Sequence, residues 1–98
     1  MDTHGAMIVN KMDNVATALS DLAVGDQVIL IGTGNLGGIK ASQPVPFGHK
    51  IALISIAEGE TIVKYGEVIG RATQRITQGD HVHIHNVESL RGRGDVHE

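Results

Sequence analysis

The stretch KIALISIAEGETIVKYGEVIGRAT, residues 50–73, decides the fold class of this chain. It contains three short runs rich in aliphatic and β-branched residues, at 50–56, 61–66 and 68–73. The sequences EGE and YGE separate these runs, and such Gly-containing segments are turn signals. The stretch therefore predicts short strands separated by tight turns, with Gly66 at the turn of a hairpin.

Outward from this stretch, three further apolar runs at 7–10, 27–31 and 81–86 read as strands. One segment has a different period: in residues 13–22, apolar residues recur at helical spacing, and Asp13 or Asn14 would be a good N-cap. The sequence therefore predicts a small, mostly-β domain with one short N-terminal helix.

The composition supports one modest domain. The chain has 98 residues, with 13 Gly and only 2 Pro, which favours tight turns over long helices. Its core must be aliphatic, because there is one Phe, one Tyr and no Trp. A core of this size gains stability when a partner covers one face, so a homo-oligomer is compatible with the sequence.

Charge and hydropathy exclude several classes of protein. The net charge is −3 and no basic stripe is present, so we expect no nucleic-acid binding. No apolar run approaches about 18 residues, and the N-terminus lacks the pattern of a secretory signal. There is no Cys to form a disulfide or a thiolate ligand. These features predict a cytoplasmic protein with no membrane association, and the RGD triplet in the tail is incidental.

A glycine pattern resembling a nucleotide fingerprint occurs at Gly32, Gly34 and Gly37, directly after an apolar run. That fingerprint requires a helix to begin at the glycines. Pro44 and Pro46 follow closely and would interrupt such a helix. We therefore interpret the segment as a Gly-rich hairpin loop.

The stretch GDHVHIHN, residues 79–86, carries His81, His83 and His85 at alternate positions. On a strand these side chains share one face, with Val82 and Ile84 on the core face. Two such histidines can reach one metal ion, and Asp80, Glu67 and Glu60 are acids that could contribute. A solvated edge strand explains the pattern equally well.

Two other segments carry candidate groups. His49 and Lys50 stand at a loop–strand junction, where an acid/base group can lie beside a fixed positive charge. The segment KYGEVIGR contains Tyr65, Glu67 and Arg71, although a plain hairpin explains most of it. Arg71 could clamp a carboxylate together with Arg91 and Arg93, or the latter two could belong to a solvated tail.

Three segments together resemble a known family. DNVATALSDLAVGD, VPFGHKIALISIAEGETIVKYGEVIGRAT and GDHVHIHNVESLRGRGD are similar to the SAF domain of the altronate/galactarate dehydratases. They are also similar to the small subunit of sulfolactate sulfo-lyase. The resemblance implies a β-clip domain over residues 7–90, followed by a flexible tail at 91–98.

The resemblance also implies a function. Family members eliminate water from sugar acids to give 3-deoxy-2-keto acids, with a divalent metal, most often Fe²⁺, although Mn²⁺ or Zn²⁺ would serve. The metal would polarise substrate oxygens. Because the chain ends at Glu98, the large catalytic part is expected to be a separate subunit, and the small chain alone is expected to be inactive.

The resemblance suggests roles for particular residues. His49 and Lys50 match GHK and would be catalytic, with His49 also a metal ligand. His83 and His85 match HVHxHN and would bind the metal, ahead of the outermost His81. The substrate would contact four residues: Tyr65, Glu67, Arg71 and Asn86.

The chain departs from the family pattern at one position, and its sequence is compatible with two alternative functions. Many relatives carry a histidine where this chain has Asn10, which would weaken or alter a metal site that used it. The first alternative is the small subunit of a C–S lyase acting on sulfolactate. The second is a non-catalytic module that binds a sugar or a metal.

Overall fold

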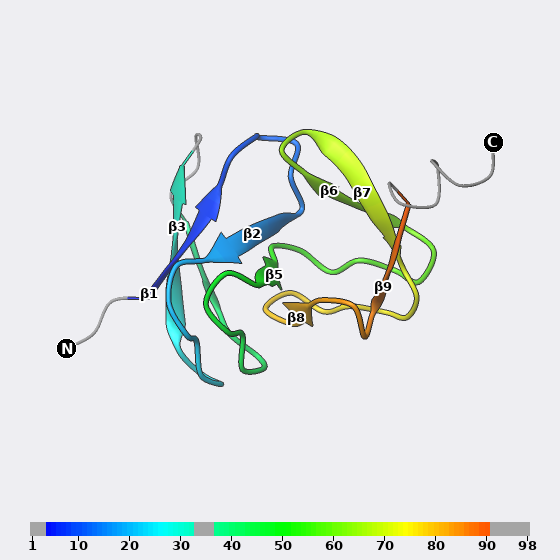
Figure 1. The fold of residues 1–98 in the computed structure, drawn as a ribbon. Coiled ribbons are helices and arrows are strands. Elements are labelled where there is room, and N and C mark those ends of the chain that lie inside the picture. Colours follow the sequence, from blue (N-terminus) through cyan, green and yellow to red (C-terminus); the bar gives the residue numbers. More distant parts are fainter. Residues whose placement is uncertain (1–3, 33–36, 91–98) are drawn as a thin grey trace.

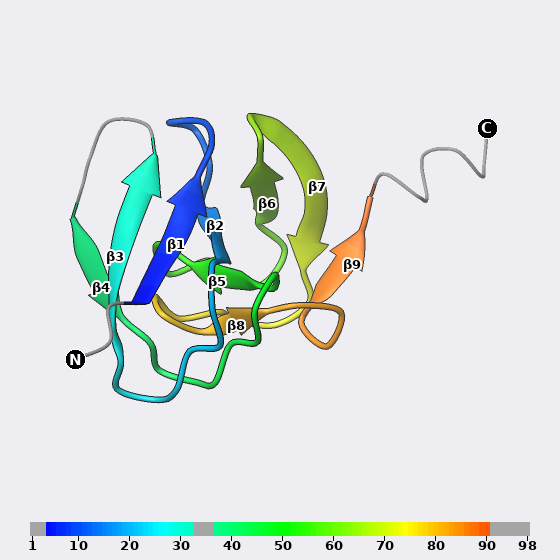
Figure 2. The same ribbon diagram turned by 60° about the vertical axis from the view of Figure 1, so that its left-hand side comes forward.

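The computed structural model describes residues 4–32 and 37–90, and they form nine strands in two sheets. The first sheet has the order β4-β3-β1-β2-β5-β8 and the second the order β6-β7-β9. The strands are β1 (His4–Ile8), β2 (Val15–Ala18), β3 (Gln27–Gly32), β4 (Gly38–Lys40), β5 (Lys50–Ala52), β6 (Thr61–Lys64), β7 (Glu67–Ala72), β8 (His81–Val82) and β9 (Val87–Ser89). Figures 1 and 2 show the second sheet on one side, with β5 and β8 near the middle.

The mostly-β prediction is confirmed, but the predicted helix at 13–22 is wrong. Residues Val15–Ala18 form β2, which pairs with β1 and β5, and the described residues contain no helix. The side chains of Asp13 and Asn14 do not cap a helix. Asp13 accepts the backbone N–H of Gly66 at 2.8 Å, and Asn14 accepts that of Val63 at 2.8 Å.

The helical appearance of this segment comes from burial on both faces of β2. Ala16 and Ala18 belong to one core cluster, whereas Val15 belongs to the other. β5 is shared in the same way, since Ile51 packs in the first cluster and Ala52 in the second. A strand buried on both faces loses the alternation of apolar and polar residues that identifies a strand.

The hairpin interpretations are supported where the structure describes the chain. β6 and β7 are antiparallel around a turn at Tyr65 and Gly66, and β4 runs antiparallel to β3. The segment after β3 is therefore not a crossover helix, although Gly34 lies outside the described residues. The tail at 91–98, with Arg91 and Arg93, also lies outside them. No helix among the described residues is long and apolar enough to cross a membrane.

Four turns of similar geometry connect the strands, and we call them the glycine turns: 22–26, 45–49, 56–60 and 76–80. Each begins with a buried aliphatic residue, and these residues pair as Leu22 with Val45 and Ile56 with Ile76. Each contains a glycine with a φ between 86° and 91°. The last residue of each donates its N–H to the carbonyl three positions earlier. These turns fix where the residue after each glycine lies.

Substituting these glycines tests the packing around the turns. Gly59→Ala should cost about 1–2 kcal/mol from the left-handed backbone alone, because an added Cβ would meet nothing within 4 Å. Gly79→Ala should cost more, because its Cβ would lie 2.3 Å from the carbonyl oxygen of Lys40. Urea unfolding of both variants measures the difference, and equal losses would contradict the packing described here.

Candidate functional site

His49 is the last residue of the second glycine turn, and its side chain differs from those at the equivalent positions. In the other three turns this residue is Asp26, Glu60 or Asp80. Each of these carboxylates accepts the backbone N–H of the second turn residue, at 2.7–2.9 Å. In the second turn that residue is Pro46, which has no N–H. An acid at position 49 would therefore have no such partner, and His49 points elsewhere.

His81 and His83 come from the segment that follows the last glycine turn. His81 and Val82 form β8, which pairs with β5 so that Ile51 faces His81 and Lys50 faces Val82. Val82 is fully buried and anchors the segment. The backbone N–H of His81 also donates to the side chain of Gln43 at 2.9 Å. These contacts bring His81 and His83 to the start of β5, beside His49.

Asn86 determines the path of the chain after β8. Its side-chain oxygen accepts the N–H of His83, and its side-chain amide donates to the carbonyl of His81, both at 2.9 Å. Its own N–H donates to the carbonyl of His83 and closes a turn. The side chain is buried, so Asn86 positions the histidines, whereas the sequence predicted it to contact the substrate.

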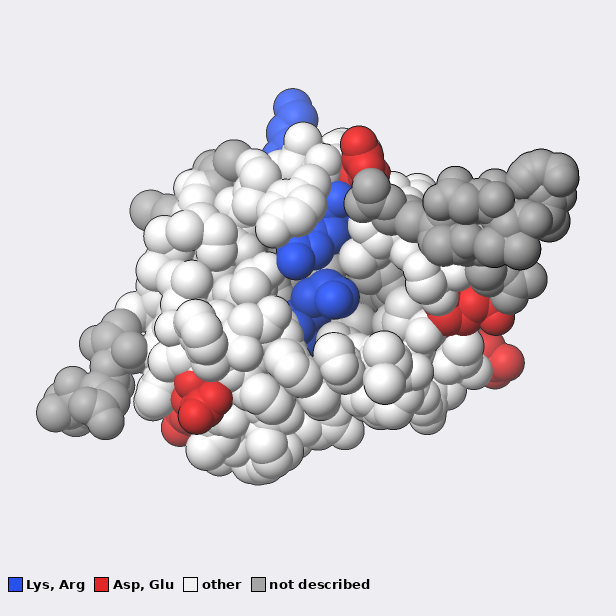
Figure 3. All heavy atoms as spheres, in the orientation of Figure 1, with Lys and Arg blue, Asp and Glu red and all other residues white. Residues whose placement is uncertain are grey.

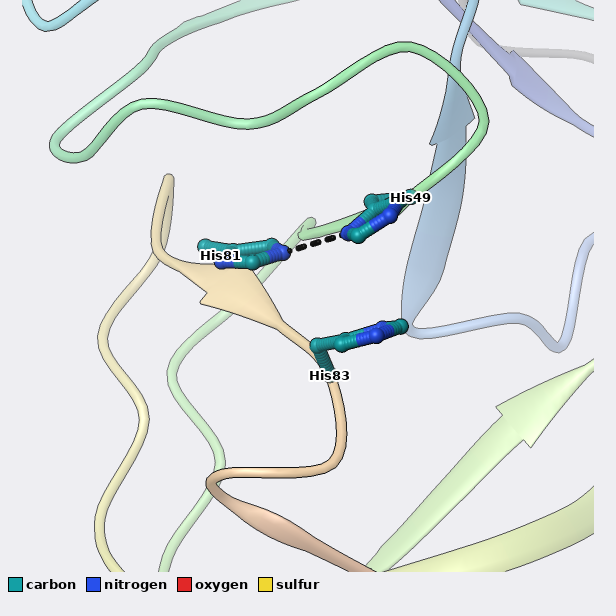
Figure 4. Close-up of side chains that lie close together, drawn as sticks. All are labelled: His49, His81 and His83. Atoms are coloured by element: carbon teal, nitrogen blue, oxygen red, sulfur yellow. Dashed lines mark hydrogen bonds between the residues drawn. The ribbon is translucent and has the colours of Figure 1, made fainter.

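His49, His81 and His83 form a compact cluster, which we call the histidine cluster (Figure 4). His49 Nδ1 lies 2.9 Å from His81 Nε2. The rings of His49 and His83 stack at a centroid distance of 4.1 Å. One nitrogen from each residue lies within 4.8 Å of the others. The cluster is partly buried, so its nitrogens can contact a ligand.

The predicted strand at 81–86 is only partly correct. It ends at Val82, and the following turn leaves Ile84 83% exposed rather than on the core face. The ring of His85 lies 5.1 Å from that of His81, tilted by 39°, but His85 is not part of the cluster. The structure therefore brings His81 together with His49 and His83, whereas the sequence favoured His85.

The surroundings of His81 and His83 favour the neutral form of these two imidazoles. Burial, followed by the nearby His85, His49, His83 and Lys50, lowers the pKa of His81 to about 4. Burial and the charges of His49, Lys50 and His85 also lower the pKa of His83. Neutral imidazole is the form that binds a metal ion. Near neutral pH, His81 and His83 are therefore ready to act as ligands.

The lowered pKa of His81 predicts that the folded state loses stability as the pH falls from about 6.5 towards 4. In this range the unfolded chain binds a proton that folded His81 does not, so the free energy of unfolding rises with pH. Urea unfolding at pH 5 and pH 7, with a chelator present, measures the change. In His81→Gln the difference between the two pH values should shrink, and an unchanged difference would contradict the prediction.

The donor set of the cluster suits a divalent transition metal. Two nitrogens bound side by side to one ion at about 2.1 Å lie about 3 Å apart, close to the 2.9 Å between His49 and His81. Three imidazoles leave coordination positions open for a substrate. Asp80 and Glu60 do not join the cluster, because their carboxylates cap their own turns. Within the described part of the chain, the cluster contains no carboxylate.

A hollow of about 350 Å³ adjoins the cluster, and His83 belongs to both. Figure 3 shows basic side chains one above the other in the middle of this face. The hollow is lined by Lys50, Lys64, Tyr65, Ile69, His83, Ile84, Val87 and Ser89. The structure thus places Lys50 and Tyr65 in one hollow with His83, and their catalytic and substrate-binding roles stay predictions.

Glu67 and Arg71 are not among the residues that line this hollow. Both belong to β7, and Arg71 lies 3.8 Å from Glu88 of β9 in an exposed ion pair. Their predicted contact with a substrate stays a prediction. Lys64, which directly precedes Tyr65 in the same candidate segment, also lines the hollow.

The part of the chain that carries the cluster and the hollow is similar to known proteins. A family model described as the altronate/galactarate dehydratase SAF domain matches residues 4–90, which include the histidine cluster and the hollow. The chain belongs to this family. The resemblance inferred from GHK, KYGEVIG and HVHIHN is therefore confirmed.

The individual relatives of this SAF domain are named either as sugar-acid dehydratases or as a subunit of a sulfo-lyase. Altronate dehydratase of Bacillus subtilis is 42% identical over 81 residues, which cover 83% of this chain and 16% of the relative. The (2R)-sulfolactate sulfo-lyase subunit alpha of Chromohalobacter salexigens is 53% identical over 47 residues, 48% of this chain and 50% of the relative. Galactarate dehydratase of Escherichia coli is 38% identical over 71 residues, 72% of this chain and 13% of the relative. The SAF domain thus spans a small part of these dehydratases and half of this lyase subunit.

Asn10, the position at which the resemblance led us to expect a histidine, lies in the loop between β1 and β2. Its side-chain oxygen accepts the N–H of Met12 at 2.8 Å. Its side-chain amide also lies against Gly66, where an added Cβ would be 2.7 Å from the amide nitrogen. In this SAF domain Asn10 supports the turn between β6 and β7 and does not belong to the histidine cluster.

Proposed function

We propose that this SAF domain is the small subunit of a two-component sugar-acid dehydratase of the altronate/galactarate type. It would contribute to a metal-dependent elimination of water together with a separate large catalytic subunit. One observation carries the proposal: His49 of GHK meets His81 and His83 of HVHIHN in one cluster, at the edge of a hollow lined by two lysines. A Lewis-acid site beside positive charge suits a carboxylate substrate.

The metal would be held by His49, His81 and His83, with Fe²⁺ preferred and Mn²⁺ or Zn²⁺ as alternatives. When bound, such an ion polarises substrate oxygens and stabilises the charge that develops on them. Lys50 would offset the negative charge that builds on the carboxylate as the neighbouring carbon loses its proton. The remainder of the substrate site would come from the large subunit.

A second candidate function is supported by the sulfo-lyase relatives. The sulfo-lyase subunit alpha of Paracoccus pantotrophus is 40% identical over 53 residues, and these cover 79% of that protein. A protein named as a subunit, most of which matches this domain, supports a C–S lyase assembled from more than one chain on the same scaffold. The histidine cluster and the hollow would serve both reactions, because both substrates carry a carboxylate.

The test is to co-express the chain with the large dehydratase or sulfo-lyase subunit of its own organism and to assay each component separately and together. Release of a 2-keto acid from altronate or galactarate by the complex alone supports the proposal. Release of sulfite from sulfolactate would favour the lyase. Turnover by the small chain equal to that of the complex would overturn the two-component assignment, and tight binding of metal and aldonate without any turnover would favour a binding module.

A further inference from the structure

Lys50 and Lys64 bring two positive charges into the hollow beside the histidine cluster. Neither lysine forms an ion pair within the described residues, and no acidic side chain from that part of the chain lines the hollow. From the described residues this pair therefore receives no counter-charge within the hollow, and an anionic ligand would supply one.

Lys64 is directed by the aromatic ring next to it. Its Nζ lies 4.7 Å from the centroid of the Tyr65 ring, which is the geometry of a cation–π contact. Three aliphatic side chains, Ile69, Ile84 and Val87, complete the wall of the hollow. An ion in this setting is less hydrated than on an open surface, so a bound anion would be attracted more strongly.

The backbone at Tyr65 is unfavourable for a tyrosine. Its φ is 58°, which makes it the one non-glycine residue with positive φ in the described part of the chain. With Gly66 at φ 75°, it forms the kind of two-residue hairpin turn that prefers Asn-Gly. Asp13 holds this turn by accepting the N–H of Gly66. A bulky residue kept in such a conformation points to a use for its side chain.

We propose that Lys50 and Lys64 form a carboxylate-binding subsite, and that the ring of Tyr65 holds Lys64 over it. The carboxylate of a hydroxy acid would bind between the two lysines, with the rest of the molecule extending past His83 towards the histidine cluster. The identity of the ligand rests on the proposed function, whereas the existence of an anion subsite rests on the lysines and Tyr65.

The test uses the full chain with a chelator and no partner, so that neither metal nor turnover is needed. Galactarate and altronate are titrated while backbone amide signals are followed by NMR, with the neutral polyol altritol as the matched ligand lacking a carboxylate. The acids should shift the signals of Lys50, Lys64 and Tyr65, and the affinity should fall as salt is added. Equal binding of the polyol would overturn the subsite.

Variants separate this subsite from a general attraction to positive charge. Lys50→Gln and Lys64→Gln should each weaken binding of the acids about 10-fold, as expected for loss of one charge-assisted hydrogen bond. Lys64→Arg should retain most of the affinity, and Lys40→Gln, on β4, should leave it unchanged. Equal losses in Lys40→Gln and Lys64→Gln would contradict the proposal.

Tyr65→Asn gives two readouts of opposite sign. Asparagine tolerates positive φ, so the thermal midpoint of unfolding should rise. Loss of the ring should weaken binding of the acids several-fold, because Lys64 is no longer held over the hollow. A lower midpoint would show that the ring has a structural role, and unchanged binding would exclude it from the subsite.

The outcomes are distinct from those for the proposed function. If the isolated chain binds galactarate or altronate but no complex turns them over, the subsite is supported and the proposed dehydratase function is contradicted. If the complex turns the acids over and Lys64→Gln leaves its KM unchanged, the dehydratase function is supported and the subsite is contradicted.

Discussion

Replacing His81 with alanine is expected to weaken the binding of a divalent ion by the isolated chain at least about 100-fold. Loss of groups that merely orient a ligand typically costs 10–100-fold, and His81 would be a direct ligand. Its Nε2 lies 2.9 Å from His49 Nδ1, at the centre of the cluster. Titration with Zn²⁺, or with Fe²⁺ under anaerobic conditions, measures the change by calorimetry.

The matched control for this prediction is His85→Ala. His85 lies in the same segment but outside the cluster, so its removal should change the affinity less than about threefold. If His85→Ala weakened binding as much as His81→Ala, His85 would also be a ligand and the cluster of three histidines would not be the whole site. If neither variant changed the affinity, the cluster would not be the metal site.

Replacing Asn86 with alanine is expected to lower the free energy of unfolding by about 2–3 kcal/mol, because two backbone groups lose their partners where water has little access. Asn86 is 5% exposed and bonds to the backbone of both His81 and His83. Because these bonds position the histidines, metal affinity should fall as well. Urea unfolding and metal titration of the same sample give both quantities.

Gln74→Ala is the control for Asn86→Ala. Gln74 also donates a side-chain amide to this loop, at 3.3 Å from the carbonyl of His85, but it is exposed. Its removal should cost less than about 0.5 kcal/mol, as is usual for surface substitutions. If Asn86→Ala were equally mild, Asn86 would not determine the path of the histidine loop.

The sequence predicted the β class and the hairpin at Gly66, and it singled out His49 and the histidine-rich segment, which the structure brings together. These depend on local signals, namely turn residues and short apolar runs. The helix at 13–22 was wrong because β2 packs into both cores, and that depends on the whole fold. The short strands β4 and β9 were missed because three residues carry too little periodicity to be recognised.

Alternation along a strand could not show that His81, rather than His85, belongs to the histidine cluster. The strand ends at Val82 because Asn86 folds the chain back, which places His85 outside the cluster. A signal for His49 was nevertheless present: LAVGD, IAEGE and ITQGD share the pattern of an aliphatic residue, two residues, Gly and an acid. VPFGH repeats the pattern with Pro46 removing the N–H and His49 replacing the acid. That exception marks His49 as the position where the side chain has another use.

The sharing of β2 and β5 between two cores has a consequence for the motions of the domain. Neither core can separate while the other stays intact, so both should open in a single cooperative event. The amide protons of Ala18 and Ala52, bonded to the carbonyls of His49 and Asp80, should therefore exchange with deuterium only on global unfolding. The residues at the start of β5 would then keep their spacing whether or not a ligand is bound, and a substrate would meet a preformed surface.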